Sequence, residues 1–200
     1  MKTRLPMKSL LLPALALIAL GCATSAPPPA APDASPAANR TLHQFTRESG
    51  TAGWGIEDDL VMGGLSRGRL EIDEAGNAVF SGTLSLANDG GFSSIQRDFD
   101  SIDVSSCRAL CLGLKGDGRS GQVRVESSSA DRHAYAFDFD TSGDWQVIQI
   151  PFADMYAIRH GDRLDLPPYP GQTLSRVQIL VGDGRPGPFR LEIDRLWLIK

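Results

Sequence analysis

Short runs of alternating apolar and polar residues recur along the chain after residue 40, and Gly, Asp, Asn or Pro separates one run from the next. This period of two places neighbouring side chains on opposite faces of a β-strand. No window of helical length keeps a period of 3.6 residues. The pattern therefore predicts an antiparallel, all-β sandwich without a helix longer than about two turns. The clearest predicted strands cover residues 78–86, 109–114, 122–126, 134–139, 145–150, 176–181 and 189–199.

The N-terminus has a different pattern, because basic residues precede one apolar run at residues 10–20. A membrane-spanning helix needs about 20 apolar residues, so this run is too short and indicates an export signal. The run closes on Gly21-Cys22, and residues 19–22 are similar to the bacterial lipobox, although Ala19 and Leu20 are swapped relative to its usual order. We expect residues 1–22 to be a lipoprotein signal peptide and Cys22 to carry the lipid. Cleavage of an ordinary signal peptide near Ala23 or Ala26 is the alternative.

Residues 23–39 are almost entirely Ala, Pro, Ser and Thr, a composition that predicts a disordered tether ahead of a folded domain at residues 40–200. Ala23 provides no aspartate signal for retention in the inner membrane. We therefore expect the protein in the bacterial cell envelope, lipid-anchored to the outer membrane and facing the periplasm. Loss of the signal peptide leaves 17 of the 20 basic residues against 24 acidic residues. This balance argues against nucleic acid as a partner, and no basic amphipathic segment suggests membrane contact beyond the lipid.

The residues give little support for a metal, a cofactor or catalysis. Cys107 and Cys111 are predicted to remain unpaired, because their Cα atoms would lie about 13 Å apart in an extended strand. The glycines of 116–121 match a dinucleotide-binding pattern, but a strand follows them where a helix is needed, which indicates a hairpin turn.

We expect no cofactor, although calcium at one of the aspartate clusters is an alternative. No nucleophile, base and carboxylate stand in a known arrangement, so we expect no enzyme, with a carboxylate-based hydrolase as the third hypothesis.

Several segments combine glycine, aromatic and polar residues in a specific order. They are residues 54–66 (WGIEDDLVMGGLS), 88–95 (NDGGFSSI), 115–119, 145–152 and 187–193. In this order and spacing the chain resembles the complex I intermediate-associated protein 30 family. The sequence departs from the family pattern at Asp58, at Gln96-Arg97 and at 159–161.

The resemblance implies a galactose-binding-like β-sandwich of jelly-roll type, and a role as an assembly or scaffold factor that binds a protein client. An exported member would need a different client, or would have to reach the same client from the periplasmic side. A carbohydrate-binding module at the cell envelope is the alternative, since the fold is related to such modules. The burial of Trp54, Tyr135, Trp145 and Tyr169 should discriminate the two functions, because sugar recognition needs exposed rings.

The glycine pairs 63–64 and 90–91 suggest close backbone approach. We therefore expect residues 59–66 and 88–94 to lie side by side, with polar side chains exposed on a common rim. The candidate binding residues are Trp54, Asp59, Asn88, Phe92, Ser94, Asp117 and Arg119. The alternative is a structural role, in which Asp59 caps a turn, Trp54 and Trp145 close the ends of the sandwich, and Arg119 pairs with Asp117 or Asp183.

Overall fold

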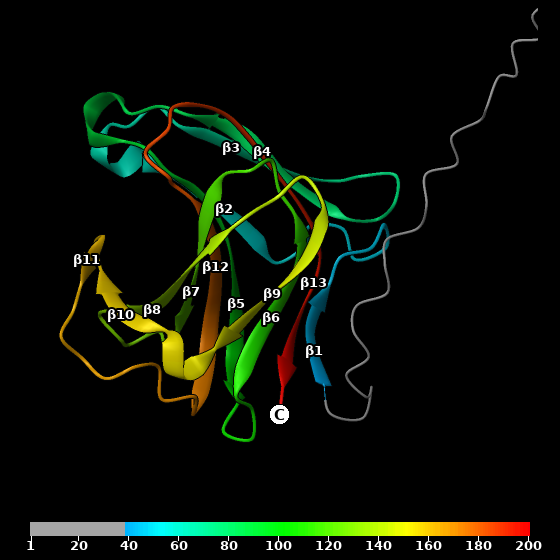
Figure 1. Ribbon diagram of the computed structural model, residues 1–200, viewed down its shortest axis with the longest axis vertical. Helices are drawn as coiled ribbons and strands as arrows, with labels where there is room; N and C mark the ends of the chain where they lie inside the picture. Colours follow the sequence, from blue (N-terminus) through cyan, green and yellow to red (C-terminus); the bar gives the residue numbers. More distant parts are fainter. Residues whose placement is uncertain (1–38) are drawn as a thin grey trace, which may run out of the picture.

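Two antiparallel sheets make up residues 39–200, the part of the chain that the computed structural model describes (Figure 1). The first sheet has six strands in the order β3-β4-β13-β6-β9, and β1 also pairs with β13. These strands are β1 (Asn39–Gln44), β3 (Arg67–Ile72), β4 (Ala78–Leu84), β6 (Ala109–Lys115), β9 (Trp145–Pro151) and β13 (Gly187–Ile199). The predicted signal peptide, Cys22 and most of the predicted tether lie outside the described residues.

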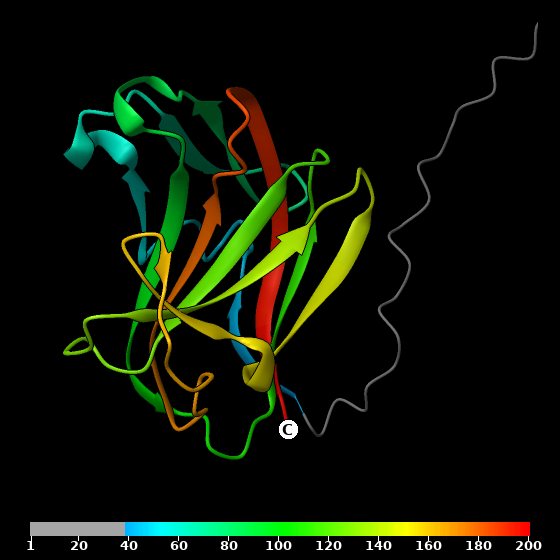
Figure 2. The same ribbon diagram turned by 60° about the vertical axis from the view of Figure 1, so that its left-hand side comes forward.

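The second sheet has seven strands in the order β11-β10-β8-β7-β12-β5-β2. They are β2 (Trp54–Asp58), β5 (Ser93–Asp103), β7 (Ser120–Glu126), β8 (Ala134–Asp140), β10 (Tyr156–Arg159), β11 (Asp162–Arg163) and β12 (Thr173–Val181). Figure 2 shows the same sheets from a second direction, in which β7 and β8 cross in front of β12. Every strand pairing in both sheets is antiparallel.

The prediction of an all-β sandwich is confirmed. Within residues 39–200 the helices are three 3-10 turns of three or four residues, η1 (Asp59–Met62), η2 (Ala87–Asp89) and η3 (Phe152–Asp154). None of them is long and apolar enough to cross a membrane. All seven segments predicted as strands form strands, and the sequence pattern missed β1, β2, β3, β5, β10 and β11.

The core lies between the sheets because alternate residues of each strand point inward. On β7 the inward residues Val123 and Val125 are at most 1% exposed, whereas Gln122 and Arg124 between and beside them are half-buried on the outer face. Leu112 of β6 closes the core from the opposite sheet. The period of two read from the sequence therefore separates the packed face of each sheet from its outer face.

Strand β13 is the structural centre of the six-stranded sheet. It pairs with β4 through Gly187 to Ile193 and with β6 through Glu192 to Ile199. Its last residues also pair with β1, so that Asn39 stands opposite Ile199. Asn39 and the last residues of β13 therefore lie together at one end of the sandwich.

Candidate functional site

Residues 59–66 and 88–94 lie side by side at the end of the sandwich opposite Asn39, as the sequence predicted (Figures 1 and 2). The side-chain amide of Asn88 donates a hydrogen bond to the carbonyl oxygen of Gly63 at 2.8 Å. The backbone amide of Gly91 donates to a carboxylate oxygen of Asp59 at 2.6 Å. We call these two segments the loop pair.

Asp59 holds the loop pair together from inside. Its side chain accepts hydrogen bonds from the amide and the hydroxyl of Ser66, at 3.0 and 2.6 Å, and from the amides of Gly91 and Phe92. Burial would raise the pKa of Asp59, but these hydrogen bonds keep it below its usual value. The residue is only 1% exposed, so the expectation that Asp59 stands on a solvent-facing rim is wrong. Because the carboxylate already accepts four hydrogen bonds from the loops, it does not face a partner.

The glycines of the loop pair make room for this carboxylate. A Cβ atom on Gly64 would lie 2.3 Å from the carboxylate carbon of Asp59. A Cβ atom on Gly90 would lie 2.5 Å from the Oδ2 atom of the same carboxylate. Both distances are well below van der Waals contact. Gly64 and Gly90 are therefore required by the close approach of the loops to Asp59.

Three leucines of this region expose apolar side chains. Leu60 is 48% exposed, Leu65 is 55% exposed and Leu86 is 45% exposed. The hydroxyl of Ser66, next to Leu65, accepts a hydrogen bond from the amide of Ser85, next to Leu86. We call Leu60, Leu65 and Leu86 the leucine surface. The hydrogen bonds of the Asp59 carboxylate to Ser66, Gly91 and Phe92 fix the backbone of the loop pair near these leucines.

Asp117 and Arg119 form a second structural corner at the same end. The carboxylate of Asp117 accepts a hydrogen bond from the amide of Arg190 at 2.8 Å, which ties the β6–β7 turn to β13. The guanidinium of Arg119 pairs with Asp183 at 2.7 Å, and the two side chains are only 11% and 5% exposed. Arg119 also donates to the backbone carbonyls of Arg185 and Pro186 in the β12–β13 loop and of Pro188 in β13. These contacts give both residues a structural role.

The structure does not bring all of the predicted residues together. Trp54 lies at the far end of β2 from the loop pair, and its ring packs 5.2 Å from the ring of Phe45. Phe92 lies next to the β12–β13 loop, because a Cβ atom placed on Gly182 would be 3.1 Å from the Cβ atom of Phe92. Ser94 is fully buried, and its hydroxyl accepts a hydrogen bond from Gln178 at 3.0 Å. Whether any predicted residue contacts a partner stays a prediction.

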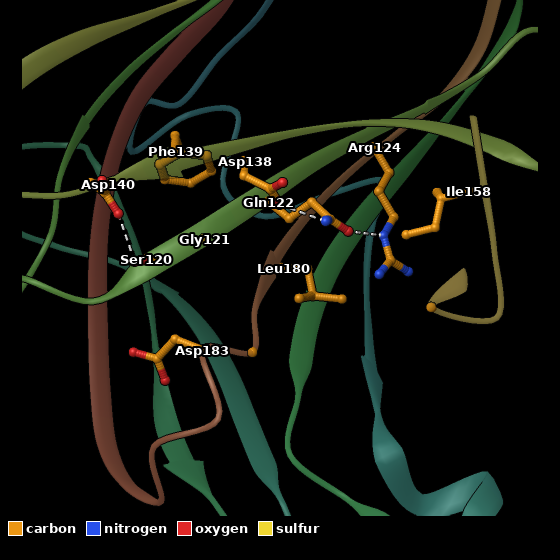
Figure 3. Close-up of a pocket in the computed structure, with 12 residues that line it drawn as sticks. Ser120, Gly121, Gln122, Arg124, Asp138, Phe139, Asp140, Ile158, Leu180 and Asp183 are labelled. Carbon is orange, nitrogen blue, oxygen red and sulfur yellow. Dashed lines mark hydrogen bonds between the residues drawn. The ribbon is translucent and has the colours of Figure 1, made fainter. Parts of the chain in front are cut away.

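A cleft of about 650 Å³ lies on the outer face of the seven-stranded sheet, and sequence reasoning missed it (Figure 3). Its side chains come from β7, β8, β10 and β12 and from the loop after β12. Leu180 and Ile158 supply apolar surface, and Gln122, Arg124, Asp138, Asp140 and Asp183 supply hydrogen-bonding groups. Clefts of this size commonly hold small ligands. An alternation of polar residues on β7 was visible in the sequence, but it did not show which strands lie beside β7.

A hydrogen-bond network fixes the polar side chains of the cleft. The amide of Gln122 donates to Asp138 at 2.7 Å and to the hydroxyl of Tyr156 at 3.0 Å, and Tyr156 donates to Asp138 at 2.6 Å. Burial, followed by the bond to Asp138, raises the pKa of Tyr156 to about 12, which keeps its hydroxyl protonated. The guanidinium of Arg163 lies 4.4 Å from the centre of the Tyr156 ring. One face of that ring is thus already occupied.

None of the four rings named as discriminators forms an exposed platform for sugar stacking. Tyr169 is 3% exposed and packs against Tyr135, which is half-buried. Trp54 and Trp145 are also half-buried. Only Tyr169 is fully buried, so the criterion set from the sequence does not separate the two functions.

The described residues contain no group of three or more His, Cys, Asp or Glu side chains placed to hold a metal ion. Calcium binding therefore stays an untested alternative. Cys107 and Cys111 are both free thiols, as predicted. Burial raises the pKa of Cys111 to about 11, so this thiol is protonated and unreactive at neutral pH.

The sequence model of complex I intermediate-associated protein 30 matches residues 43–193, which is most of the chain. The chain belongs to the complex I intermediate-associated protein 30 family. This confirms the resemblance carried by the glycine-rich segments, two of which form the loop pair of this family member. No curated protein sequence matches the chain.

Among solved structures, this member of the complex I intermediate-associated protein 30 family is similar to carbohydrate-binding modules. The family 11 module of a cellulosomal cellulase from Clostridium thermocellum shares 19% identity with a TM-score of 0.58, covering 80% of this chain and 94% of the module. The same module in complex with a β-1,3-1,4-mixed-linked tetrasaccharide gives 20% identity and a TM-score of 0.58, covering 81% and 95%. A family 30 module gives 14% identity and a TM-score of 0.55, covering 81% and 99%. These similarities show the galactose-binding-like, jelly-roll fold.

Proposed function

We propose that this protein is a non-catalytic binding module that acts as an assembly or scaffold factor and holds a protein client on the leucine surface. The observation that carries the proposal is the exposure of Leu60, Leu65 and Leu86 on loops fixed by the buried Asp59. Single exposed leucines are normal on protein surfaces, but a group at one corner is typical of a protein contact. A fixed backbone also lowers the entropy lost on binding. The family description, a protein associated with an assembly intermediate, supports a protein client.

The non-catalytic part of the proposal is supported by the surroundings of the three histidines. His43 packs 4.5 Å from Phe45, and burial lowers its pKa to about 4. His133 packs against Tyr135 at 5.0 Å. No hydrogen bond within residues 39–200 joins His43, His133 or His160 to a serine, a cysteine or a carboxylate. A histidine base for nucleophilic catalysis would need such a partner.

A triple variant, Leu60→Ser, Leu65→Ser and Leu86→Ser, tests the leucine surface. The full-length protein is crosslinked in envelope membranes and purified, and the client is identified by mass spectrometry. We expect the triple variant to lose the client of the wild type. Leu166→Ser, at a site 48% exposed elsewhere on the molecule, is the matched control and should retain it. Recovery of the same client by the folded triple variant would contradict the proposal.

We also propose that Cys22 anchors the mature chain to the outer membrane, facing the periplasm. The short apolar run and Gly21-Cys22 support this processing. Because Asn39 lies at the end of the sandwich opposite the loop pair, such an anchor would leave the leucine surface accessible to a client (Figures 1 and 2). Mass spectrometry of the mature N-terminus tests the anchor. An unmodified chain that starts at another residue, such as Ala23 or Ala26, would rule it out.

Binding of a glycan in the cleft is the second candidate function. The cleft itself favours it, because the side-chain amide of Gln122 and several carboxylates line it together with the apolar side chains of Leu180 and Ile158. A module of the same fold has been solved with a tetrasaccharide. Recognition here would depend on hydrogen bonds more than on ring stacking, since the Tyr156 ring is covered on one face by Arg163.

A further inference from the structure

Arg124 is the one side chain of the cleft lining that carries a positive charge. It is half-buried on β7, and its Nε donates to the side-chain oxygen of Gln122 at 2.5 Å. Among the described residues no acceptor is bonded to its two terminal nitrogens. Figure 3 shows these nitrogens below the Gln122 contact, beside Ile158. The end of the guanidinium that could hold a bidentate anion is therefore free.

The carboxylates near Arg124 are bonded to other groups. Glu57 accepts a hydrogen bond from Gln178 at 3.2 Å, and Asp138 accepts from Gln122 and Tyr156. Neither forms an ion pair with Arg124 within the part of the chain that the structure describes. Burial lowers the pKa of Arg124, a sign that its charge has lost hydration that these neighbours only partly replace. Partly buried charges in proteins are normally paired, so Arg124 lacks an anion.

We propose that Arg124 binds the carboxylate of an acidic saccharide that occupies the cleft, an inference that rests on the second candidate function. A guanidinium with both terminal nitrogens free matches the two oxygens of a carboxylate. The network around Gln122 holds the arginine in place before the ligand arrives. The preformed geometry favours binding because little side-chain entropy is lost.

The position of the cleft favours a saccharide over a peptide. Peptides commonly add to a free strand edge or fill an apolar groove, whereas this cleft lies on the face of a sheet whose backbone groups are already paired. Recognition must then come from side chains such as Asp138 and Asp140, which accept hydrogen bonds from hydroxyl groups. Asp140 stands four residues along the paired strands from the level of Arg124, or about 13 Å. The ligand therefore carries its carboxylate at one end and neutral hydroxyl groups at the other.

The aspartates of the rim also limit the charge of the ligand. Asp138 and Asp140, which form no ion pair within residues 39–200, would repel a chain with a carboxylate on every sugar. We therefore expect one carboxylate to be better than several. Two probes separate these cases, glucuronosyl-xylotriose with one carboxylate and trigalacturonate with three.

Isothermal titration calorimetry with the folded full chain tests the proposal. Each probe is compared with its carboxyl-reduced counterpart, and we expect glucuronosyl-xylotriose to bind about tenfold more tightly than its reduced form, the loss of one charged hydrogen-bonded pair. Arg124→Gln should remove this difference, and Arg124→Lys should restore part of it. Arg69→Gln, which removes an exposed cation from the other sheet, is the matched control. Thermal melting shows whether each variant is folded.

The outcomes separate the inference from the function on which it rests. Equal binding of acidic and reduced saccharides would overturn the role of Arg124 but leave glycan binding standing. No binding of any saccharide would overturn both. The final titration uses an acetylated tripeptide, once with a free C-terminal carboxylate and once with an amidated C-terminus. Arg124-dependent binding of the free form alone, without saccharide binding, would assign the cleft to polypeptide carboxylates and refute the proposal.

Discussion

Replacing Asp59 with alanine should destabilise the whole domain, because the loop pair depends on this carboxylate. The side chain is 1% exposed and accepts four hydrogen bonds, three of them from backbone amides. A buried donor left without an acceptor costs about 1–3 kcal/mol. The hydroxyl of Ser66 has another acceptor, the carbonyl of Ser85 at 3.4 Å, so three orphaned amides dominate the loss. We expect about 3–5 kcal/mol, allowing for water that enters the vacated space.

Urea and thermal unfolding of the purified protein measure this loss. For a domain of this size, 1 kcal/mol lowers the melting temperature by about 2–4 °C, so a fall of about 6–20 °C is expected. Asp59→Asn keeps one acceptor oxygen and should lose less. Asp144→Ala, at an exposed turn position, is the matched control and should melt with the wild type.

The pH dependence provides a second check. The pKa of Asp59 is lower in the folded protein than in the unfolded chain, so its stabilisation is present above the unfolded pKa of about 4 and is lost as the pH falls through the folded pKa. The difference between wild type and Asp59→Ala should therefore shrink in acid. If Asp59→Ala melts with Asp144→Ala at neutral pH, the carboxylate is not a structural clamp and the account of the loop pair is wrong.

Three further variants probe other parts of the fold. Gly64→Val should lower the urea midpoint strongly, because its Cβ would overlap the Asp59 carboxylate at 2.3 Å, whereas Gly143→Val, with no atom within 4 Å, should not. Arg119→Gln should cost about 1–3 kcal/mol in the same assay, since it removes one of the two cations, Arg119 and Arg185, that pair with the Asp183 carboxylate, which is only 5% exposed. The wild type should lose stability as the pH falls from 6.5 towards 4, because folded His43 resists protonation, and His43→Phe should abolish that loss.

The sequence predicted the strands whose inward residues are uniformly apolar. β7 and β12 read clearly because Val123, Val125, Val177 and Ile179 alternate with polar residues. β5 was missed because Arg97 stands between Ile95 and Phe99 and interrupts the apolar alternation. Its guanidinium instead donates to the carbonyl of Ala52 at 2.8 Å. Such a contact depends on the turn before β2, which is distant in sequence, and a period of two does not predict it.

The candidate sites show a similar division. The glycine pairs correctly indicated that two distant loops meet, because a glycine has no side chain and allows two backbone segments to approach closely. The burial of Asp59 was not predictable, since the donors that satisfy it come from residues 66, 91 and 92. The cleft was missed because Arg124, Asp138 and Ile158 become neighbours only when β7, β8 and β10 pair. The residues of a turn can be interpreted from the local sequence. The residues that become neighbours on the face of a sheet depend on the order of the strands, which the local sequence does not give.

The central place of β13 has a consequence for how this domain folds. It is the last strand of the domain in sequence order, yet β1, β4 and β6 all pair with it. The six-stranded sheet therefore cannot close until β13 has been synthesised. Pairings of such sequence separation form slowly, and β4 and β6 would wait with unpaired edges that invite aggregation. Removal of even a few residues of β13 should therefore harm folding of the domain more than loss of an edge strand.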